Sequence, residues 1–370
     1  MPYKPFSFVG KTFLPKELAN PRRILITNFG NTAETIQSLP ILVAVKHRFP
    51  HAEIAWLIGA ESAPLISDHW AINRFIIIRK DWLKHPSEIR RTRKRLQAFA
   101  PQVAIDPQSS FASAFASWLA NAHYRIGFAG KYARFFYNVR VLTDEKHQIY
   151  RKLHLLQPFG IYGCDIAFDM PDCEKDKITA RNILHQKGLL GNFALLHVSA
   201  ERPEARWQEE RFGAVARHLL EEWNLPSLIT WCGGDQEYRR AESVIHFSGG
   251  AALQSLETTL AQRGALAKSA TVFIGSDSAE LQLAAAVGTQ TIGLFGTPST
   301  WDSAPLGLEH RSVLAKSITK YGSKRILLQD GMEAIQSRMV MEKSDELLSS
   351  ILQPSVLPLH QVPAAQKKAA

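Results

Sequence analysis

Short apolar runs alternate with stretches of helical periodicity along most of this chain, and the complete alternation occurs twice. In the first half we expect strands at residues 23–29, 53–58, 75–79 and 102–106 and helices at 34–48, 87–99 and 109–121. In the second half we expect strands at 193–198, 227–232, 271–275 and 290–295 and helices at 208–222, 236–246, 255–268 and 279–287. Such alternation with short connections favours parallel sheets covered by helices on both faces. The sequence therefore predicts an α/β fold with two doubly wound domains, whose ligands bind in a cleft at the carboxyl ends of the strands.

The polar segment "DMPDCEKDKITARN" separates the two halves and indicates a linker that runs into a helix. We therefore expect a first domain over residues 1–175 and a second domain over residues 176–355, because the chain is long enough for two. A last helix near 341–352 could pack back on the first domain. The final stretch, 356–370, is poor in core-forming residues and is expected to be disordered.

The formal net charge of +10 favours anionic partners. Much of the excess lies in one segment, which sets a single acid, Glu88, against Lys84, Arg90, Arg91, Arg93, Lys94 and Arg95. Apolar residues recur there at helical spacing, so the segment is a basic amphipathic helix. It is either a solvated helix face or a helix that rests on an anionic membrane surface. No recognised nucleic-acid-binding module accompanies it, and nucleic acid is not expected as a partner.

The sequence also indicates where the protein works. It holds no run of eighteen apolar residues, so no transmembrane helix is expected. The first twenty residues lack the continuous apolar segment of a secretory signal. The three cysteines have no C-x-x-C spacing and indicate neither a disulfide framework nor a zinc site. We therefore expect a cytoplasmic protein.

Polar and small residues follow the expected strands of the second half. In "GSDSAELQLAAAVG", Ser276, Asp277 and Ser278 stand where a helix begins, and the N–H groups and dipole of that helix end can bind an anion. Asp277 followed by Glu280 also resembles a capping box, which needs no ligand. In "SAERPEARW", Arg206 could hold a diphosphate or simply stack on the tryptophan that follows it.

The first half offers its own polar residues after strands. The stretch "GNTAETIQSLPIL" places Glu34 alone in the first turn of a helix, where it is either a carboxylate stabilised by the helix dipole or a general base. In "DPQSSFASA", Asp106, Gln108 and Ser113 could line the cleft, although Asp106 could equally cap the next helix. No G-x-G-x-x-G follows the first strand, which disfavours a dinucleotide-dependent dehydrogenase.

In their order and spacing, these stretches resemble glycosyltransferase family 9, the heptosyltransferases of lipopolysaccharide core biosynthesis, which have the GT-B fold. The resemblance runs from about residue 22 to residue 307. The first family motif, Gly-Asp-(apolar)-(apolar)-x-x-x-Pro, places its catalytic acid at Glu34 when counted back from Pro40. "DPQSSFASA" is similar to D-x-Q-G-x-x-K-S-A, "ARWQEERF" to K-x-W-P-x-E-R-F, and "GSDSAELQLAAAVG" to G-x-D-S-G-P-x-H-L-A-A-A-x-G. The stretches "YRIGF" and "TIGLFGTPSTWDSAPLG" also match the family.

The resemblance implies two Rossmann-like domains, the N-terminal one for the acceptor and the C-terminal one for a nucleotide sugar. It implies an inverting, metal-independent transfer of a sugar, heptose first of all, from a donor such as ADP-heptose to the lipopolysaccharide core or a related glycan. Glu34 is then the general base, and neither a cofactor nor a metal is expected. The implied donor-site residues are Ser199, Arg206, Gly233, Ser276, Asp277, Ser278 and Gln282. The implied acceptor-site residues are Asp106, Gln108, Ser113 and Arg125.

The same resemblance implies a lipid-linked acceptor at the inner face of the cytoplasmic membrane. The basic helix at residues 84–95 could then contact that anionic surface peripherally. The protein would be cytoplasmic, with this peripheral contact as its link to the membrane.

Several positions depart from the family pattern. Glu34 replaces the aspartate of the first motif, Ala112 and Ala205 stand where the family has lysines, and Glu280 and Gln282 replace a proline and a histidine. Glu280 is expected to add a negative charge where the diphosphate should bind. These departures motivate a second interpretation, a catalytically degenerate carbohydrate- or nucleotide-binding protein on the same fold. A third is another sugar-nucleotide enzyme, such as an epimerase of GT-B type.

Overall fold

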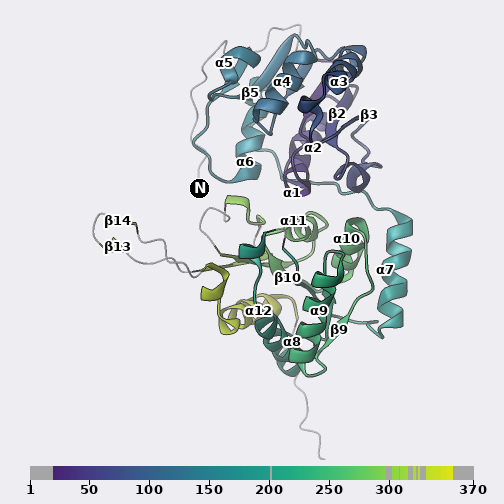
Figure 1. The fold of residues 1–370 in the computed structure, drawn as a ribbon, viewed down its shortest axis with the longest axis vertical. Coiled ribbons are helices and arrows are strands. Elements are labelled where there is room, and N and C mark those ends of the chain that lie inside the picture. Colours follow the sequence, from purple (N-terminus) through teal and green to yellow (C-terminus); the bar gives the residue numbers. More distant parts are fainter. Residues whose placement is uncertain are drawn as a thin grey trace, which may run out of the picture.

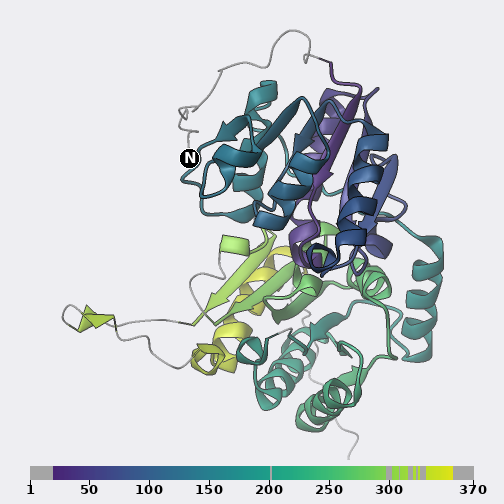
Figure 2. The same ribbon diagram turned by 45° about the horizontal axis from the view of Figure 1, so that its top comes forward.

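The computed structural model describes residues 20–200, 202–296, 302–307, 309–315 and 331–352, together with the backbone of 320–321 and 324–325. The chain forms two α/β halves that lie one above the other along the long axis (Figure 1). Helix α7 (Glu174–Gln186) runs along one side of the molecule, between the two halves in the sequence. Figure 2 shows the first half (purple to teal) meeting the second half (green to yellow) along one edge.

The first half, residues 20–173, forms a six-stranded sheet in the order β3-β2-β1-β4-β5-β6, with every neighbouring pair parallel. Its strands are β1 (Arg23–Thr27), β2 (Glu53–Gly59), β3 (Arg74–Ile78), β4 (Val103–Ile105), β5 (Tyr124–Phe128) and β6 (Val139–Val141). Its α-helices are α1 (Thr32–Ile36), α2 (Leu39–Arg48), α3 (Pro86–Phe99), α4 (Phe111–Leu119), α5 (Ala133–Phe136) and α6 (Gln148–Leu153). Short 3-10 turns complete it, at η2 (Ala63–Ile66), η3 (Trp82–Lys84) and η4 (His154–Phe159).

The described part of the second half forms another six-stranded parallel sheet, in the order β12-β11-β10-β7-β8-β9. Its strands are β7 (Ala194–His197), β8 (Ser227–Thr230), β9 (Ala252–Gln254), β10 (Val272–Ser276), β11 (Thr291–Phe295) and β12 (His310–Leu314). After α7, its helices are α8 (Glu209–Trp223), α9 (Asp235–Ser248), α10 (Leu260–Ser269), α11 (Ala279–Ala286) and α12 (Ser337–Ile351). The remaining short elements are η5 (Pro203–Ala205), η7 (Gly331–Ala334) and the antiparallel pair β13 (Lys320–Tyr321) and β14 (Lys324–Arg325).

In each sheet the chain begins at a central strand, adds strands on one side of it, and then adds the remaining strands on the other side. In the first sheet β1 lies between β2 and β4, and in the second β7 lies between β8 and β10. This reversal is the point at which a doubly wound sheet leaves a crevice at the carboxyl ends of its strands. The two crevices, after β1 and β4 and after β7 and β10, are therefore the places to look for ligand-binding residues.

Alternation along a buried strand fills the core on both faces of each sheet. In β1, Ile24 and Ile26 belong to the apolar cluster on one face. Leu25 belongs to the cluster on the other face, together with Leu96 and Phe99 of α3. The expected doubly wound α/β architecture is thus confirmed for both halves.

Element boundaries differ from the expected ones where local chemistry intervenes. The expected helix at 34–48 is two helices, α1 and α2, because Pro40 stands in the first turn of α2 and has no N–H to continue a helix. The strands β5, β6, β9 and β12 were not expected from the sequence. Three of these, β6, β9 and β12, lie at sheet edges, where a strand needs no continuous apolar run.

The last helix corrects another expectation. Instead of returning to the first domain, α12 packs on α8, β11 and β12 of the second half, and Val340, Leu347 and Leu348 lie in that core. Its apolar stripe is covered there, so it has no face left to carry to the first domain. The domain limits at residues 175 and 355 stay predictions, and the tail at 356–370 lies outside the described residues. Among the residues described, no helix is long and apolar enough to cross a membrane.

Candidate active site

Glu34 lies in the crevice of the first half, just after β1. The side chain of Asn31 caps α1 by accepting a hydrogen bond from the Glu34 N–H at 2.9 Å. The Glu34 side chain is exposed and folds over Gly30, so closely that a side chain at residue 30 would overlap the carboxylate. The absence of a side chain at Gly30 therefore leaves room for the Glu34 carboxylate. An exposed carboxylate at this position can accept a proton from a bound hydroxyl.

The backbone of Glu34 is held more firmly than that of an ordinary first-turn residue. Its carbonyl oxygen accepts hydrogen bonds from Asn28 Nδ2 at 3.1 Å, Ser38 Oγ at 2.8 Å and Lys152 Nζ at 3.0 Å. Lys152 is 4% exposed, and burial lowers its pKa to about 8, against the raising effect of the Glu34 charge. Sequence reasoning did not find Lys152, which is 118 residues from Glu34 and lies in no recognised motif.

Asp106 is fully buried and does not line the cleft. Its carboxylate accepts hydrogen bonds from Tyr137 Oη at 2.5 Å and from the N–H groups of Gln108 and Ser109 at 3.0 Å each. Burial raises the pKa of Asp106 to about 6, although these hydrogen bonds oppose the shift. Asp106 therefore shapes the loop before α4. Gln108 does reach the crevice, where its Oε1 accepts from the Phe29 N–H at 3.1 Å.

Two further acceptor candidates also have structural partners. Ser113 is buried and forms a capping box with Ser110 at the start of α4. The guanidinium of Arg125 donates to the main-chain oxygens of Ala122 and Phe136, at 2.8 and 2.7 Å. These contacts argue against direct acceptor binding by either residue, and among the four candidates Gln108 alone touches the segment that leads to Glu34.

In the second half, the donor candidates gather at the crevice between β7 and β10. Ser276 ends β10, and Ser278 caps α11 by accepting from the Leu281 N–H at 3.2 Å. The capping residue is thus Ser278, not Asp277 as the capping-box interpretation expected. Ser199 follows β7, and its Oγ accepts a hydrogen bond from the Cys232 N–H, just after β8, at 2.9 Å.

Gly233 follows β8 in an exposed turn. A Cβ at this position would lie 2.7 Å from Glu257 Oε1, so the glycine allows the two segments to approach closely. Gln282, in α11, is 3% exposed and donates to the Ser303 main-chain oxygen at 2.6 Å. It therefore holds the loop that follows β11 over the end of α11.

The two arginines of the loop after β7 have different surroundings. Arg206 is half-buried and pairs with Glu237 at 2.7 Å, so its charge is already neutralised. The Arg202 side chain is 58% exposed and lies 3.9 Å from Asp277 Oδ2, beside the N-terminus of α11. Arg202, which the donor-site prediction did not include, also has a carboxylate partner, but it is the more exposed of the two cations and lies beside the helix N-terminus.

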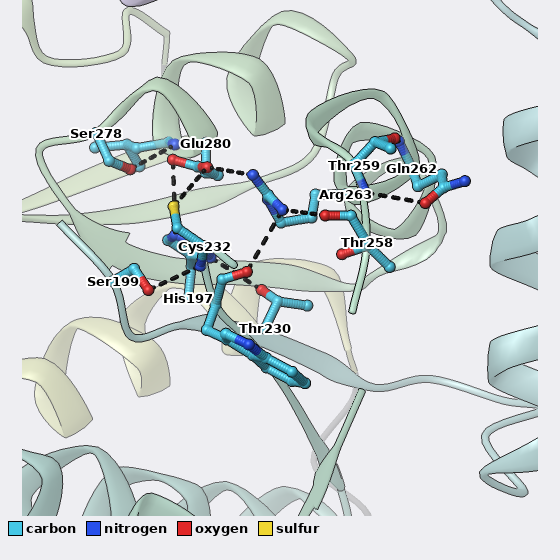
Figure 3. Close-up of polar contacts among 12 residues, drawn as sticks. His197, Ser199, Thr230, Cys232, Thr258, Thr259, Gln262, Arg263, Ser278 and Glu280 are labelled. Atoms are coloured by element: carbon cyan, nitrogen blue, oxygen red, sulfur yellow. Dashed lines mark hydrogen bonds and ion pairs between the residues drawn. The ribbon is translucent and has the colours of Figure 1, made fainter. Parts of the chain in front are cut away.

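Glu280 corrects the expectation of an exposed negative charge at this helix end. The residue is 7% exposed and turns into the interior, where Oε1 pairs with Arg263 at 2.9 Å (Figure 3). Its Oε2 lies 3.6 Å from His197 Nε2. Burial alone would raise the Glu280 pKa, but the Arg263 guanidinium and the His197 ring, which is protonated only at acid pH, outweigh burial and hold the pKa at about 2. The carboxylate is therefore compensated internally and does not face a bound phosphate.

A cluster of metal-ligand types lies at the same place. His197, Cys232 and Glu280 bring donor atoms within 4.8 Å of one another, and zinc accepts all three donor types. Figure 3 shows how hydrogen bonds also connect this cluster, with His197 Nδ1 at 3.1 Å from Thr230 Oγ1. Burial raises the pKa of the Cys232 thiol to about 12 and lowers that of His197 to about 4. The donor set could hold an ion, and Arg263 already neutralises its one carboxylate.

The helix after β1 and the helix after β10 pack against each other at the junction of the halves. Helix α1 packs against α11, and Leu283 of α11 joins the core cluster of the first half. The two helices lie next to each other at the junction in Figure 1. The α11 residues that contact the core of the first half are Leu283, Ala286 and Val287, in the later part and at the C-terminal end of that helix.

Comparison with known proteins decides the family. The model of glycosyltransferase family 9 (heptosyltransferase) matches residues 89–325. The chain belongs to this family. It is 26% identical to lipopolysaccharide heptosyltransferase 1 of Salmonella typhimurium over 206 residues, which span 50% of this chain and 63% of that one. It is 22% identical to lipopolysaccharide heptosyltransferase 1 of Campylobacter coli over 355 residues, which span 91% of this chain and 97% of that one.

Solved structures confirm the GT-B fold for this family-9 chain. A family-9 glycosyltransferase from Veillonella parvula superposes with a TM-score of 0.75 at 17% identity, over 89% of this chain and 98% of the other. Escherichia coli heptosyltransferase WaaC with ADP-2-deoxy-2-fluoro heptose superposes with a TM-score of 0.67 at 20% identity, over 88% and 99%. At these identities the likeness shows the fold alone, so the substrates have to be argued from the residues of this chain.

Proposed function

We propose that this family-9 glycosyltransferase moves a heptose from a nucleoside diphosphate donor to a glycan of the lipopolysaccharide core, with inversion at the anomeric carbon. The curated relatives are named lipopolysaccharide heptosyltransferases, and solved relatives hold ADP or ADP-2-deoxy-2-fluoro heptose. Two features of this chain support the same chemistry, namely the crevice after each first strand and the opposed helices α1 and α11.

One observation carries the proposal. The exposed carboxylate of Glu34 stands in the first turn of α1, and α1 packs against the helix whose N-terminus forms the other crevice. A donor sugar whose phosphates rest on that N-terminus would present its anomeric carbon to an acceptor held beside Glu34. Among the described α-helices of the first half, Glu34 is the one exposed carboxylate that stands in a first turn.

The reaction needs one base and a stabilised leaving group. Glu34 accepts the proton of the acceptor hydroxyl while that oxygen forms a bond to the anomeric carbon. The bond between the anomeric carbon and the diphosphate oxygen breaks on the opposite face, and the nucleoside diphosphate leaves with the electron pair. Arg202 and the N-terminal N–H groups of α11 stabilise the charge that develops on the diphosphate.

The remaining candidates have supporting roles in this proposal. Asp277, partly exposed beside Arg202, accepts hydrogen bonds from donor-sugar hydroxyls. Ser199 and Ser276 are buried at the ends of β7 and β10 and shape the donor crevice from below, whereas Gly233 is exposed. Gln282 holds the loop after β11, and Arg206 orders the second half through Glu237 rather than binding the diphosphate.

The acceptor in this proposal is lipid-linked, so the enzyme works at the inner face of the cytoplasmic membrane. Helix α3 has the charge for such a surface. Its exposed side carries Arg90, Arg91, Arg93, Lys94 and Arg95, and its other side is buried through Thr92, Leu96 and Phe99. The expected basic amphipathic helix is thus present, and its contact with anionic lipid belongs to the proposal.

A thermal-shift panel tests the donor class. A ligand that binds only the folded state raises the melting temperature in proportion to the logarithm of its concentration. We expect a shift with ADP-heptose and with ADP, and none with nucleotides that lack a diphosphate. A shift with another nucleotide sugar alone would move the donor within the same class. No shift with any member of the panel would favour the degenerate binding protein and would contradict the proposal.

A further inference from the structure

Four large aromatic side chains of α4 and of the segment around α5 are exposed. Their exposed fractions are 47% for Phe111, 50% for Trp118, 36% for Tyr132 and 62% for Phe135. We call these four residues the aromatic face. Exposed apolar residues are ordinary when they stand singly, but a contiguous group marks an interaction surface.

Helix α4 is apolar on both sides, and only one side is needed for the core. Its inner side is buried through Ala114, Ala116 and Ser117, and the Ser117 hydroxyl meets Thr27 of β1 at 2.9 Å. Phe111 and Trp118 are exposed on the other side. Phe115, at helical spacing between them, is half-buried and stacks on the buried Trp82 at 6.1 Å. Core packing therefore explains Phe115 but not the exposed aromatic side chains at positions 111 and 118.

The aromatic rings are ordered by stacking on one another. Phe115 stacks on Phe111 at 6.2 Å and on Trp118 at 5.8 Å, with interplanar angles of 5° and 19°. Tyr132 packs edge-on against Phe111 at 5.4 Å, which joins α4 to the segment before α5. Three of the four rings of the aromatic face, those of Phe111, Trp118 and Tyr132, are thus connected to one another through Phe111 and Phe115, and Phe135 follows Tyr132 by three residues in the chain.

Cations accompany the rings. The Lys131 ammonium lies 5.5 Å from the ring centre of Tyr132, and the Arg134 guanidinium lies 4.6 Å from that of Phe135. The basic helix α3, whose arginines and lysines are exposed, packs against α4. Aromatic rings flanked by cations match the interface of an anionic bilayer, where rings sit at headgroup depth and cations meet lipid phosphates.

The face also lies beside the acceptor side of the crevice. Phe111 follows Gln108 by three residues, and Gln108 contacts the Phe29 N–H just before Glu34. We propose that the aromatic face, with Lys131, Arg134 and the basic side of α3, docks on an anionic phospholipid bilayer and so brings a lipid-linked acceptor to the crevice. The delivery of an acceptor rests on the proposed function, whereas the docking itself does not.

Vesicle sedimentation tests the docking. The full chain is mixed at low salt with vesicles of phosphatidylcholine, or of phosphatidylcholine with an equal amount of phosphatidylglycerol, and the pelleted fraction is measured. We expect binding to the anionic vesicles only, reduced by added salt because the Debye length shortens. The double variant Trp118→Ser/Phe135→Ser should weaken that binding by about tenfold or more, since two large apolar side chains no longer enter the interface.

The matched control is Tyr162→Ser/Leu190→Ser, which removes two side chains of 58% and 77% exposure that lie outside the aromatic face. It should bind like the wild type, and circular dichroism and melting should show both variants folded. Wild-type protein that ignores anionic vesicles would overturn the proposal. So would unchanged binding of Trp118→Ser/Phe135→Ser alongside a loss in Arg90→Gln/Arg91→Gln/Arg93→Gln, which would leave α3 as the whole contact. Sugar transfer to a soluble acceptor fragment without vesicle binding would keep the proposed sugar transfer and overturn this inference, together with the proposed lipid contact of α3.

Discussion

The ammonium group of Lys152 donates a hydrogen bond to the main-chain oxygen of Glu34 over 3.0 Å, although 118 positions separate the two residues. The same oxygen accepts from Asn28 and Ser38, so α6 and the end of β1 both fix the turn that presents the Glu34 carboxylate. Burying an ammonium group costs free energy, and the hydrogen bond to the Glu34 carbonyl offsets part of that cost while it holds the candidate base in position.

The pH dependence of stability exposes this buried lysine. Burial lowers the Lys152 pKa from 10.5 to about 8. Between these values the unfolded chain binds more protons than the folded one, so the free energy of unfolding gains about 3 kcal/mol from this group as pH rises from 8 to 10.5. Lys152→Met removes that gain. Urea unfolding at several pH values should show that the free energy of unfolding of the wild type rises relative to that of Lys152→Met as pH increases. Lys84→Met, at an exposed lysine, should show the same pH dependence as the wild type. A constant difference for Lys152→Met would contradict the buried position.

The ion pair between Arg263 and Glu280 predicts a large loss of stability when only one partner is removed. Arg263→Met leaves a buried carboxylate without its cation and should cost about 3 to 5 kcal/mol. Adding Glu280→Gln should restore much of the loss, because no unpaired charge then remains. The control is Arg338→Met, which breaks an exposed pair with Glu342 and should cost less than about 1 kcal/mol. Equal effects of the two arginine variants in urea unfolding would show that Glu280 is not buried as described.

Substitution of the two arginines after β7, Arg202 and Arg206, should affect ADP affinity and melting temperature differently. Arg202→Gln should weaken ADP binding about tenfold with little change in melting temperature, because it removes an exposed cation beside α11. Arg206→Gln should mainly lower the melting temperature, since it leaves the largely buried carboxylate of Glu237 with only its longer contact to Arg240, at 3.8 Å. Calorimetric titration of both variants with ADP checks this. The reverse pattern would return the diphosphate contact to Arg206.

The cluster of His197, Cys232 and Glu280 gives a prediction about metal. Because Arg263 already neutralises the carboxylate and the thiol is held protonated, we expect neither a chelator nor added Zn²⁺ to change the melting temperature. Elemental analysis of the purified protein is the check. A stoichiometric metal that is lost in Cys232→Ser would contradict this expectation and assign the cluster an ion.

The sequence predicted the architecture better than the site. Strand–helix alternation is a property of neighbouring residues, so both doubly wound sheets could be expected before the structure was known. The burial of Asp106 and the pairing of Glu280 with Arg263 depend on distant segments, which a motif does not encode. Lys152 was missed for the same reason, since nothing in its own surroundings in the sequence points to Glu34.

The most direct test of the central claim is the rate of transfer by Glu34→Gln. Wild type, Glu34→Gln and Glu61→Gln, at an exposed glutamate of the same half, are assayed for ADP release from ADP-heptose with a heptose-free core acceptor. The account predicts that Glu34→Gln turns over about 10²- to 10⁴-fold more slowly with donor affinity unchanged, while Glu61→Gln behaves like the wild type. A Glu34→Gln enzyme that keeps the wild-type rate would contradict the role of Glu34 as the base.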